Sequence, residues 1–216
     1  MTNSTASINT LLFDWDGTLN DSATSGFTAF QKSLDELGVL FTEEFYEANY
    51  SPNWYTMYEA LSLPRDEWQR ADELWIYHYG EAPARLVDGA RDTVLELHRR
   101  GYRLGIVTSG SHCRVARELS GLGLTEVFQV VVCNEHIVNK KPHPEGLERA
   151  MRLIGSSPLE CAYVGDAPED IRMGKEARVH TVAVRSAYPT SLHLLSAGPD
   201  IYMDSISELL LHFPSA

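Results

Sequence analysis

From residue 84 onward, short apolar segments alternate with segments whose apolar residues recur at helical spacing. With an earlier apolar segment included, the strands are expected at residues 10–14, 103–108, 129–133, 161–165 and 180–184, and the helices at 90–100, 111–120, 144–154 and 169–177. A short strand near residue 201 and a helix from residue 205 close the chain. Such alternation is typical of a parallel sheet with helices on both faces. The sequence therefore predicts an α/β fold with a doubly wound parallel sheet.

Residues 21–83 have a different pattern, in which apolar and aromatic residues recur every three or four positions without a convincing strand. Helices are expected at residues 27–37, 42–50, 54–61 and 66–79. This block directly follows the first strand, so it interrupts the α/β domain and is expected to cover the end of that strand as a lid. The predicted organisation is a core domain of residues 1–20 and 84–216 with an all-helical cap domain of residues 21–83.

Composition excludes several classes of protein. The net charge of −12 and the lack of a basic cluster disfavour nucleic acid and anionic membranes as partners. Cys113, Cys133 and Cys161 stand far apart, which argues against a disulfide framework and a zinc site. The amino terminus lacks the features of a signal peptide, and no apolar run reaches about 18 residues. We expect a cytoplasmic protein with no obligate protein partner.

Two carboxylates, Asp14 and Asp16, stand one residue apart at the end of the first expected strand. Alternate residues of a strand face the same way, so both can face one site if the chain stays extended through Trp15. Trp15 should then point away and leave the chemistry unchanged. Two carboxylates repel each other in a dry site, and a divalent cation would relieve that repulsion. Taken alone, the stretch also fits an ordinary Asp-Gly turn.

Hydroxyl and glycine residues follow the second expected strand as Thr108, Ser109 and Gly110. A small turn that leads into a helix can bind an anion through backbone N–H groups, although a simple helix cap has the same pattern. Lys141 precedes Pro142 after the third expected strand and is the candidate site lysine. Lys140 is the alternative candidate if the register differs by one residue.

Asp166 and Asp170 follow the fourth expected strand, four residues apart. Grouped oxygen ligands of this kind suit Mg²⁺. Asp170 could instead be part of an acidic helix start, where a negative charge is favourable.

These four elements, in this order, resemble the motifs of the haloacid dehalogenase-like superfamily. The matching segments are Asp-x-Asp-Gly-Thr-Leu at 14–19, Thr-Ser-Gly at 108–110, Lys-Pro at 141–142 and Gly-Asp-x-x-x-Asp at 165–170. The helical insertion after the first motif resembles the cap of phosphoglycolate phosphatase-like and beta-phosphoglucomutase-like members. The resemblance covers the whole region outside the cap.

The resemblance implies a role for each matching residue. Asp14 would be the nucleophile, Asp16 the general acid and base, and Lys141 the cation that pairs with the nucleophile and a phosphate oxygen. The remaining roles concern binding: Thr108, Ser109 and Gly110 would bind the phosphate, and Mg²⁺ would be held by Asp14, Asp166, Asp170 and the backbone carbonyl of Asp16.

The function implied is a Mg²⁺-dependent phosphatase that hydrolyses a small phosphate monoester through an aspartyl-phosphate. A phosphomutase would use the same residues, and a non-catalytic phosphate-binding module could share the fold. A haloacid dehalogenase needs neither Mg²⁺ nor Asp16. A phosphonatase would need a cap lysine, for which Lys32 is the sole candidate, and carries a small residue in place of Asp16.

Asn53, Trp54 and Tyr55 form an expected loop that enters a cap helix, and we expect them to line the pocket above Asp14. The cap has twelve acidic and three basic residues, so few cations could pair with a second anionic group of a substrate. The leaving group is therefore expected to be neutral, apolar or cationic rather than a carboxylate. The alternative is that the cap aromatics are core and its acids a solvated face.

Overall fold

The computed structural model describes residues 8–51, 54–80 and 83–214 of the chain. Contacts divide the chain into two compact units. The first consists of residues 1–21, 84–186 and 191–216, and the second of residues 22–83 and 187–190. Across the described ranges, no helix has the length and apolar character needed to cross a membrane.

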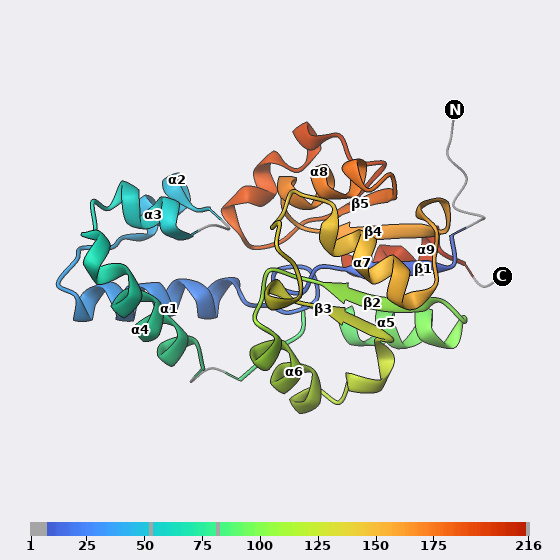
Figure 1. Ribbon diagram of the computed structural model, residues 1–216, viewed down its shortest axis with the longest axis horizontal. Coiled ribbons are helices and arrows are strands. Elements are labelled where there is room, and N and C mark those ends of the chain that lie inside the picture. The colour runs from blue at the N-terminus through green and yellow to red at the C-terminus, as the bar shows by residue number, and fades with distance from the viewer. Residues whose placement is uncertain (1–7, 52–53, 81–82, 215–216) are drawn as a thin grey trace. The chain divides into compact units, whose positions relative to one another are not determined.

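The first unit is built on a sheet of six parallel strands (Figure 1). The strands are β1 (Thr10–Phe13), β2 (Arg103–Val107), β3 (Val130–Val132), β4 (Cys161–Gly165), β5 (His180–Val184) and β6 (Ile201–Met203). Their order is β3-β2-β1-β4-β5-β6, so β1 is central and pairs with both β2 and β4. All four residues of β1 are buried, as expected of an apolar segment covered on both faces.

Helices cover both faces of this sheet (Figure 1). They are α5 (Ala90–Arg99), α6 (His112–Gly121), α7 (Glu145–Ile154), α8 (Pro168–Glu176) and α9 (Leu209–His212). Leu11 and Phe13 share a core with residues of α5, α6 and α9, whereas Leu12 packs with residues of α7 and α8. The alternation along β1 therefore places two cores on opposite faces. The predicted doubly wound α/β fold is confirmed.

Several predicted elements differ in their bounds from those observed; the first cap helix, for example, begins at Ala23 rather than at residue 27. The last helix, expected from residue 205, begins with a 3₁₀ turn at Ile206–Glu208 and continues as α9. The first strand ends at Phe13 rather than residue 14, although the Asp14 N–H still donates to the Val164 carbonyl at 2.9 Å. Asp14 is thus held by the sheet while its side chain lies beyond the strand.

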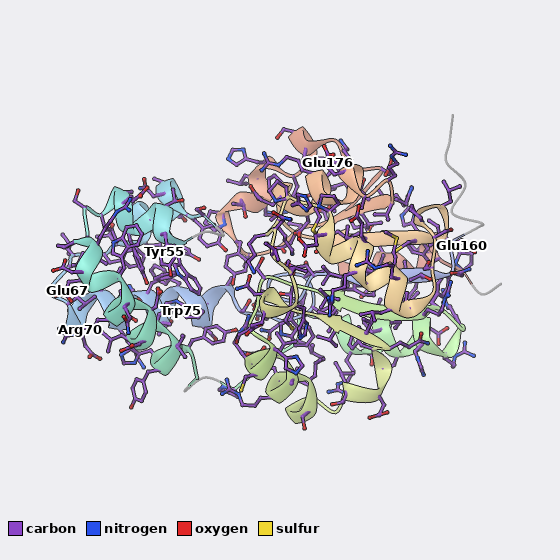
Figure 2. The ribbon with its side chains drawn as sticks, in the orientation of Figure 1. Tyr55, Glu67, Arg70, Trp75, Glu160 and Glu176 are labelled. Atoms are coloured by element: carbon purple, nitrogen blue, oxygen red, sulfur yellow. The ribbon has the colours of Figure 1, made fainter. Side chains whose placement is uncertain are left out.

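The second unit is helical, with α1 (Ala23–Glu36), α2 (Glu43–Asn49), α3 (Trp54–Ala60) and α4 (Trp68–Gly80). Its core includes Phe30, Leu34, Met57, Tyr58 and Ala71. Helices α1 and α4 pack along each other, and the indole N–H of Trp75, labelled in Figure 2, donates to the Gly26 carbonyl at 3.3 Å. The expected all-helical cap therefore has a hydrophobic core of its own.

Residues 187–190 follow β5 in the sequence but belong to the helical unit. The Tyr188 ring stacks on that of Tyr50 with centroids 5.0 Å apart, and its hydroxyl lies 3.0 Å from the Ser22 hydroxyl. These contacts account for the grouping of this segment with α1–α4.

Candidate active site

Polar side chains meet where the strand order reverses, beside the carboxyl ends of β1 and β4. Asp14 follows β1, Asp166 follows β4, and Asp170 lies in the first turn of α8. Their carboxylate oxygens lie within 4.8 Å of one another, and all three residues are buried. In open α/β sheets this reversal point is where ligands bind.

Lys141 lies between two of these carboxylates. Its Nζ is 2.8 Å from Oδ1 of Asp14 and 2.7 Å from Oδ1 of Asp170. The ammonium also lies over the ring of Tyr163, 5.7 Å from the centroid. The cation is therefore fixed from several sides rather than free to move along its flexible stem.

Asp170 is tied to protein groups through both carboxylate oxygens. Its Oδ1 accepts from Lys141, and Tyr163 Oη lies 3.1 Å from the same atom. Its Oδ2 accepts the Ala167 N–H at 3.0 Å. A Cβ at Gly165 would lie 2.5 Å from Asp170 Cγ, so a glycine is required there. This arrangement suits Asp170 to anchor Lys141.

Burial sets the protonation behaviour of the cluster. It raises the pKa of Asp14 to about 7, since the loss of hydration outweighs the opposing charge of Lys141. Burial, followed by the charges of Asp14 and Asp170, also raises the pKa of Asp166 well above its ordinary value. For Lys141, burial opposes the charged form, but the two adjacent carboxylates outweigh it and raise its pKa.

The donor set fits a hard divalent cation. Three buried carboxylates lie together, and Lys141 contacts two of them, Asp14 and Asp170. Oδ1 of Asp166 accepts the Thr18 hydroxyl at 3.0 Å, which is a neutral donor. Carboxylate oxygens are the ligands that Mg²⁺ prefers, and a second cation would offset both the burial and the mutual repulsion that raise the pKa values of Asp14 and Asp166.

The turn after β2 is organised by Thr108. Its hydroxyl accepts the Gly110 N–H at 3.0 Å, and its own N–H donates to the Val132 carbonyl at 2.9 Å. The Gly110 amide is therefore used within the turn, whereas Ser109 is exposed. A phosphate-binding role for these three residues stays a prediction.

Asp16 is not among the three clustered carboxylates, and its side chain is held by Arg114 of α6. Arg114 Nη1 donates to Oδ1 at 3.0 Å and Nη2 to Oδ2 at 2.5 Å. Gly17 has a φ of 79°, which turns the chain sharply after Asp16. The sequence analysis missed Arg114, since its only sequence signal is the i,i+4 spacing to Glu118, which says nothing of Asp16.

The three predicted cap residues have different outcomes. Asn53 lies outside the described residues. Trp54 packs within the helical unit, with its ring 4.9 Å from that of Trp75, and the Tyr55 hydroxyl donates to Asp72 at 2.8 Å. Trp54 thus packs against the core of the helical unit, whereas Tyr55 is exposed and hydrogen-bonded within that unit, and the role of both toward a substrate stays a prediction.

A second group of side chains that can bind metals consists of His112, Cys133 and His136, whose donor atoms lie within 4.8 Å of one another. Nδ1 of His136 already accepts the Cys133 N–H at 3.0 Å. Burial raises the pKa of the Cys133 thiol to about 11. These bonds shape the turn after β3, and we assign no metal to it.

The fold and the buried carboxylate cluster define a protein with a parallel α/β core, a helical insertion and a candidate metal site. The family model of haloacid dehalogenase-like hydrolases matches residues 11–184. The chain belongs to this family, as its motifs predicted, and it is an enzyme of the phosphatase class.

Curated relatives cover nearly the whole chain. Pyrophosphatase PpaX of Listeria monocytogenes serotype 4a is 31% identical over 210 residues, which are 95% of this chain and 96% of the relative. Pyrophosphatase PpaX of Bacillus cereus strain B4264 is 31% identical over 218 residues, with 94% and 95% covered.

Solved structures share the fold along the same length. A predicted phosphoglycolate phosphatase from Haemophilus somnus 129PT has a TM-score of 0.85 at 21% identity, with 95% of this chain and 97% of that chain covered. CbbY from Rhodobacter sphaeroides in complex with phosphate has a TM-score of 0.77 at 25% identity, with 95% and 99% covered.

Proposed function

We propose that the chain is a Mg²⁺-dependent phosphatase that hydrolyses a small phosphate monoester through an aspartyl-phosphate on Asp14. The observation that supports it best is the buried Asp14 carboxylate at the end of β1, paired with Lys141 and clustered with Asp166. A carboxylate held by a cation at a ligand-binding edge of the sheet is a suitable nucleophile.

In the first step an Asp14 carboxylate oxygen attacks phosphorus, the bond to the ester oxygen breaks, and Asp16 gives that oxygen a proton. In the second step Asp16 takes a proton from a water molecule, which attacks the phosphorus of the aspartyl-phosphate. Inorganic phosphate leaves and Asp14 is restored. General acid–base catalysis of this kind contributes about 10²–10⁴-fold.

Lys141 has two roles in this proposal. It holds Asp14 in place before the reaction, and its charge offsets the negative charge that develops on the transferring group. Thr108, buried at the end of β2, would contact the phosphate from another side.

Mg²⁺ is the metal that we propose for the carboxylate cluster. Asp14 and Asp166 would hold it with the backbone carbonyl of Asp16. Asp170, whose two oxygens are bonded to protein groups, would support the site through Lys141 or through water. When bound, the ion would neutralise charge on the phosphoryl group.

Pyrophosphate is a second candidate substrate, because the 31% identical relatives are pyrophosphatases by name. The same residues would serve, with phosphate as the leaving group. A phosphomutase would instead return the phosphoryl group to a second hydroxyl and would need a bisphosphate to maintain turnover. A cytoplasmic location and a freely diffusing small substrate stay predictions.

The experiment is a panel of phosphate monoesters, sugar phosphates, phosphoglycolate and pyrophosphate, assayed with Mg²⁺ for phosphate release. A monoester as the best substrate would support the proposal. Preference for pyrophosphate would favour the second candidate, and isomerisation without phosphate release would favour a mutase. Failure of every compound, with Asp14→Asn as the blank, would contradict a catalytic role and revive the binding module.

A further inference from the structure

Asp16 is connected to the hydrophobic core by a continuous chain of polar contacts. The indole Nε1–H of Trp15 donates to Oε2 of Glu118 at 2.7 Å, and Arg114 Nη1 lies 3.2 Å from the same carboxylate oxygen. Arg114 then binds both oxygens of Asp16. Two neighbours in the sequence, Trp15 and Asp16, are thus joined through two residues of α6.

Burial decreases along this chain from Trp15 to Asp16. Trp15 is fully buried in the core beneath the sheet, and the Glu118 side chain is 5% exposed. The Arg114 side chain is 16% exposed and that of Asp16 26%. An isolated buried carboxylate is costly, so Glu118 needs both its partners. Glu118 therefore holds the guanidinium through Nη1, the nitrogen that also donates to Oδ1 of Asp16.

Gly110 leaves the space in which the guanidinium lies. A Cβ at this position would collide with Arg114 Nη2. The turn between β2 and α6 is therefore shaped to admit Arg114 to Asp16. This is a separate observation from the hydrogen bonds, and it points to the same arrangement.

A guanidinium that donates two hydrogen bonds restricts a carboxylate more than a single donor does. Two parallel N–H···O bonds fix both the position and the plane of the Asp16 carboxylate. Lysine would provide a point charge without this fork. Since the orientation of a proton-transferring group strongly affects its rate, the arrangement bears on the reaction.

We propose that Arg114 is a positioning residue, held by Glu118 and Trp15, that orients Asp16 for its proton transfers. The inference rests on the proposed acid–base role of Asp16. It also gives Trp15 a part in the reaction, through Glu118, that the sequence analysis did not anticipate.

Substrates with different leaving groups separate this role from a general loss of folded protein. An alkoxide needs a proton as it leaves, whereas p-nitrophenolate leaves without one. A badly placed Asp16 should therefore slow the release of an alcohol in the first turnover and spare the release of nitrophenolate. Both substrates still need Asp16 as a base in the second step.

The test compares Arg114→Met with Arg117→Met, a matched change at an exposed arginine of the same helix. First-turnover release is measured by rapid mixing with p-nitrophenyl phosphate and with an alkyl phosphate that the wild type hydrolyses. Arg114→Met should slow alcohol release by about 10–100-fold and leave the nitrophenolate burst nearly unchanged. Arg114→Lys should recover only part, and Arg117→Met should match the wild type.

A double-mutant cycle with Asp16→Asn completes the test. If Arg114 acts through Asp16, adding Arg114→Met to Asp16→Asn should cause no further loss. Additive losses, or equal slowing of both substrates by Arg114→Met, would overturn the inference. If Arg114→Met folds poorly, Trp15→Phe is the second variant: it keeps an aromatic ring, although a smaller one, and removes the indole N–H that binds Glu118. It should show the same leaving-group pattern more weakly.

The outcomes also separate this inference from the proposed function. Wild-type rates in Asp16→Asn would contradict the acid–base role itself. Impaired Asp16→Asn together with normal Arg114→Met would overturn only the inference about Arg114.

Discussion

Lys141 Nζ lies 2.8 Å from Oδ1 of Asp14, and both side chains are almost fully buried. Burial alone disfavours each charge, so the two groups stabilise each other. Asp170 contributes a second carboxylate to the ammonium at 2.7 Å. The pair therefore depends on a third residue, and the site behaves as a connected unit rather than as separate side chains.

Replacement of the nucleophile gives the most direct test of the site. Asp14→Asn should abolish turnover, because an amide does not attack phosphorus, while the fold stays intact. Phosphate release, and intact mass of protein quenched during turnover, would measure both turnover and the covalent phosphate. Wild-type rates in this variant would contradict the whole mechanism.

Metal dependence is a second prediction. EDTA should remove activity and Mg²⁺ should restore it, whereas Ca²⁺ should substitute poorly because it favours more ligands and longer bonds. Asp166→Ala should raise the Mg²⁺ concentration needed for half-maximal rate. Metal-independent hydrolysis would argue for dehalogenase-like chemistry instead.

The pH dependence of stability follows from the raised pKa of Asp14 in the metal-free protein. Its pKa rises from 3.8 to about 7 on folding, so the native state binds a proton that the unfolded state has lost. The stabilising effect of that proton is complete below the unfolded pKa and is lost as pH rises through about 7. In EDTA, Asp14→Asn should therefore reduce the fall in unfolding free energy between about pH 5 and about pH 8. Denaturant titrations at the two pH values would measure the unfolding free energies. A fall as large in Asp14→Asn as in the wild type would contradict a raised pKa at Asp14.

Gly165 provides a test of the support for Asp170. Gly165→Ala would place a Cβ 2.5 Å from Asp170 Cγ, which requires α8 or the β4 turn to shift. Overpacking of this kind costs about 1–3 kcal/mol, and displacement of Asp170 should also lower kcat. Thermal unfolding and phosphate release would measure the two effects. Gly121→Ala is the control, because nothing lies within 4 Å of a Cβ there; equal effects at both positions would contradict the prediction.

The leaving group is the subject of the last prediction. Because the cap has only three basic residues, phosphoglycolate should be a poor substrate compared with esters of neutral or cationic alcohols. Values of kcat/KM across such a series of esters would show which leaving groups the enzyme prefers. Preference for phosphoglycolate would contradict this expectation, and preference for pyrophosphate would also weigh against it, since phosphate is an anionic leaving group.

The sequence by itself determined the succession of strands and helices along the chain and the residues that stand at the strand ends. The spacing of apolar residues and the turn residues between them are local signals, and they predicted β1, β4 and β5 clearly. Because parallel strands end at one edge, the sequence also indicated that Asp14 and Asp166 would come together. Motif order identified the family.

Only the tertiary structure decided which side chains complete the site. Arg114 is 98 residues from Asp16 in the chain, and no local pattern links them. Likewise, the sequence offered Asp170 as a metal ligand, but its fixed bonds to Lys141 and Ala167 appear only once α8 is docked on β4. Periodicity reports which face of an element is buried, whereas contacts between distant elements depend on how those faces pack against one another.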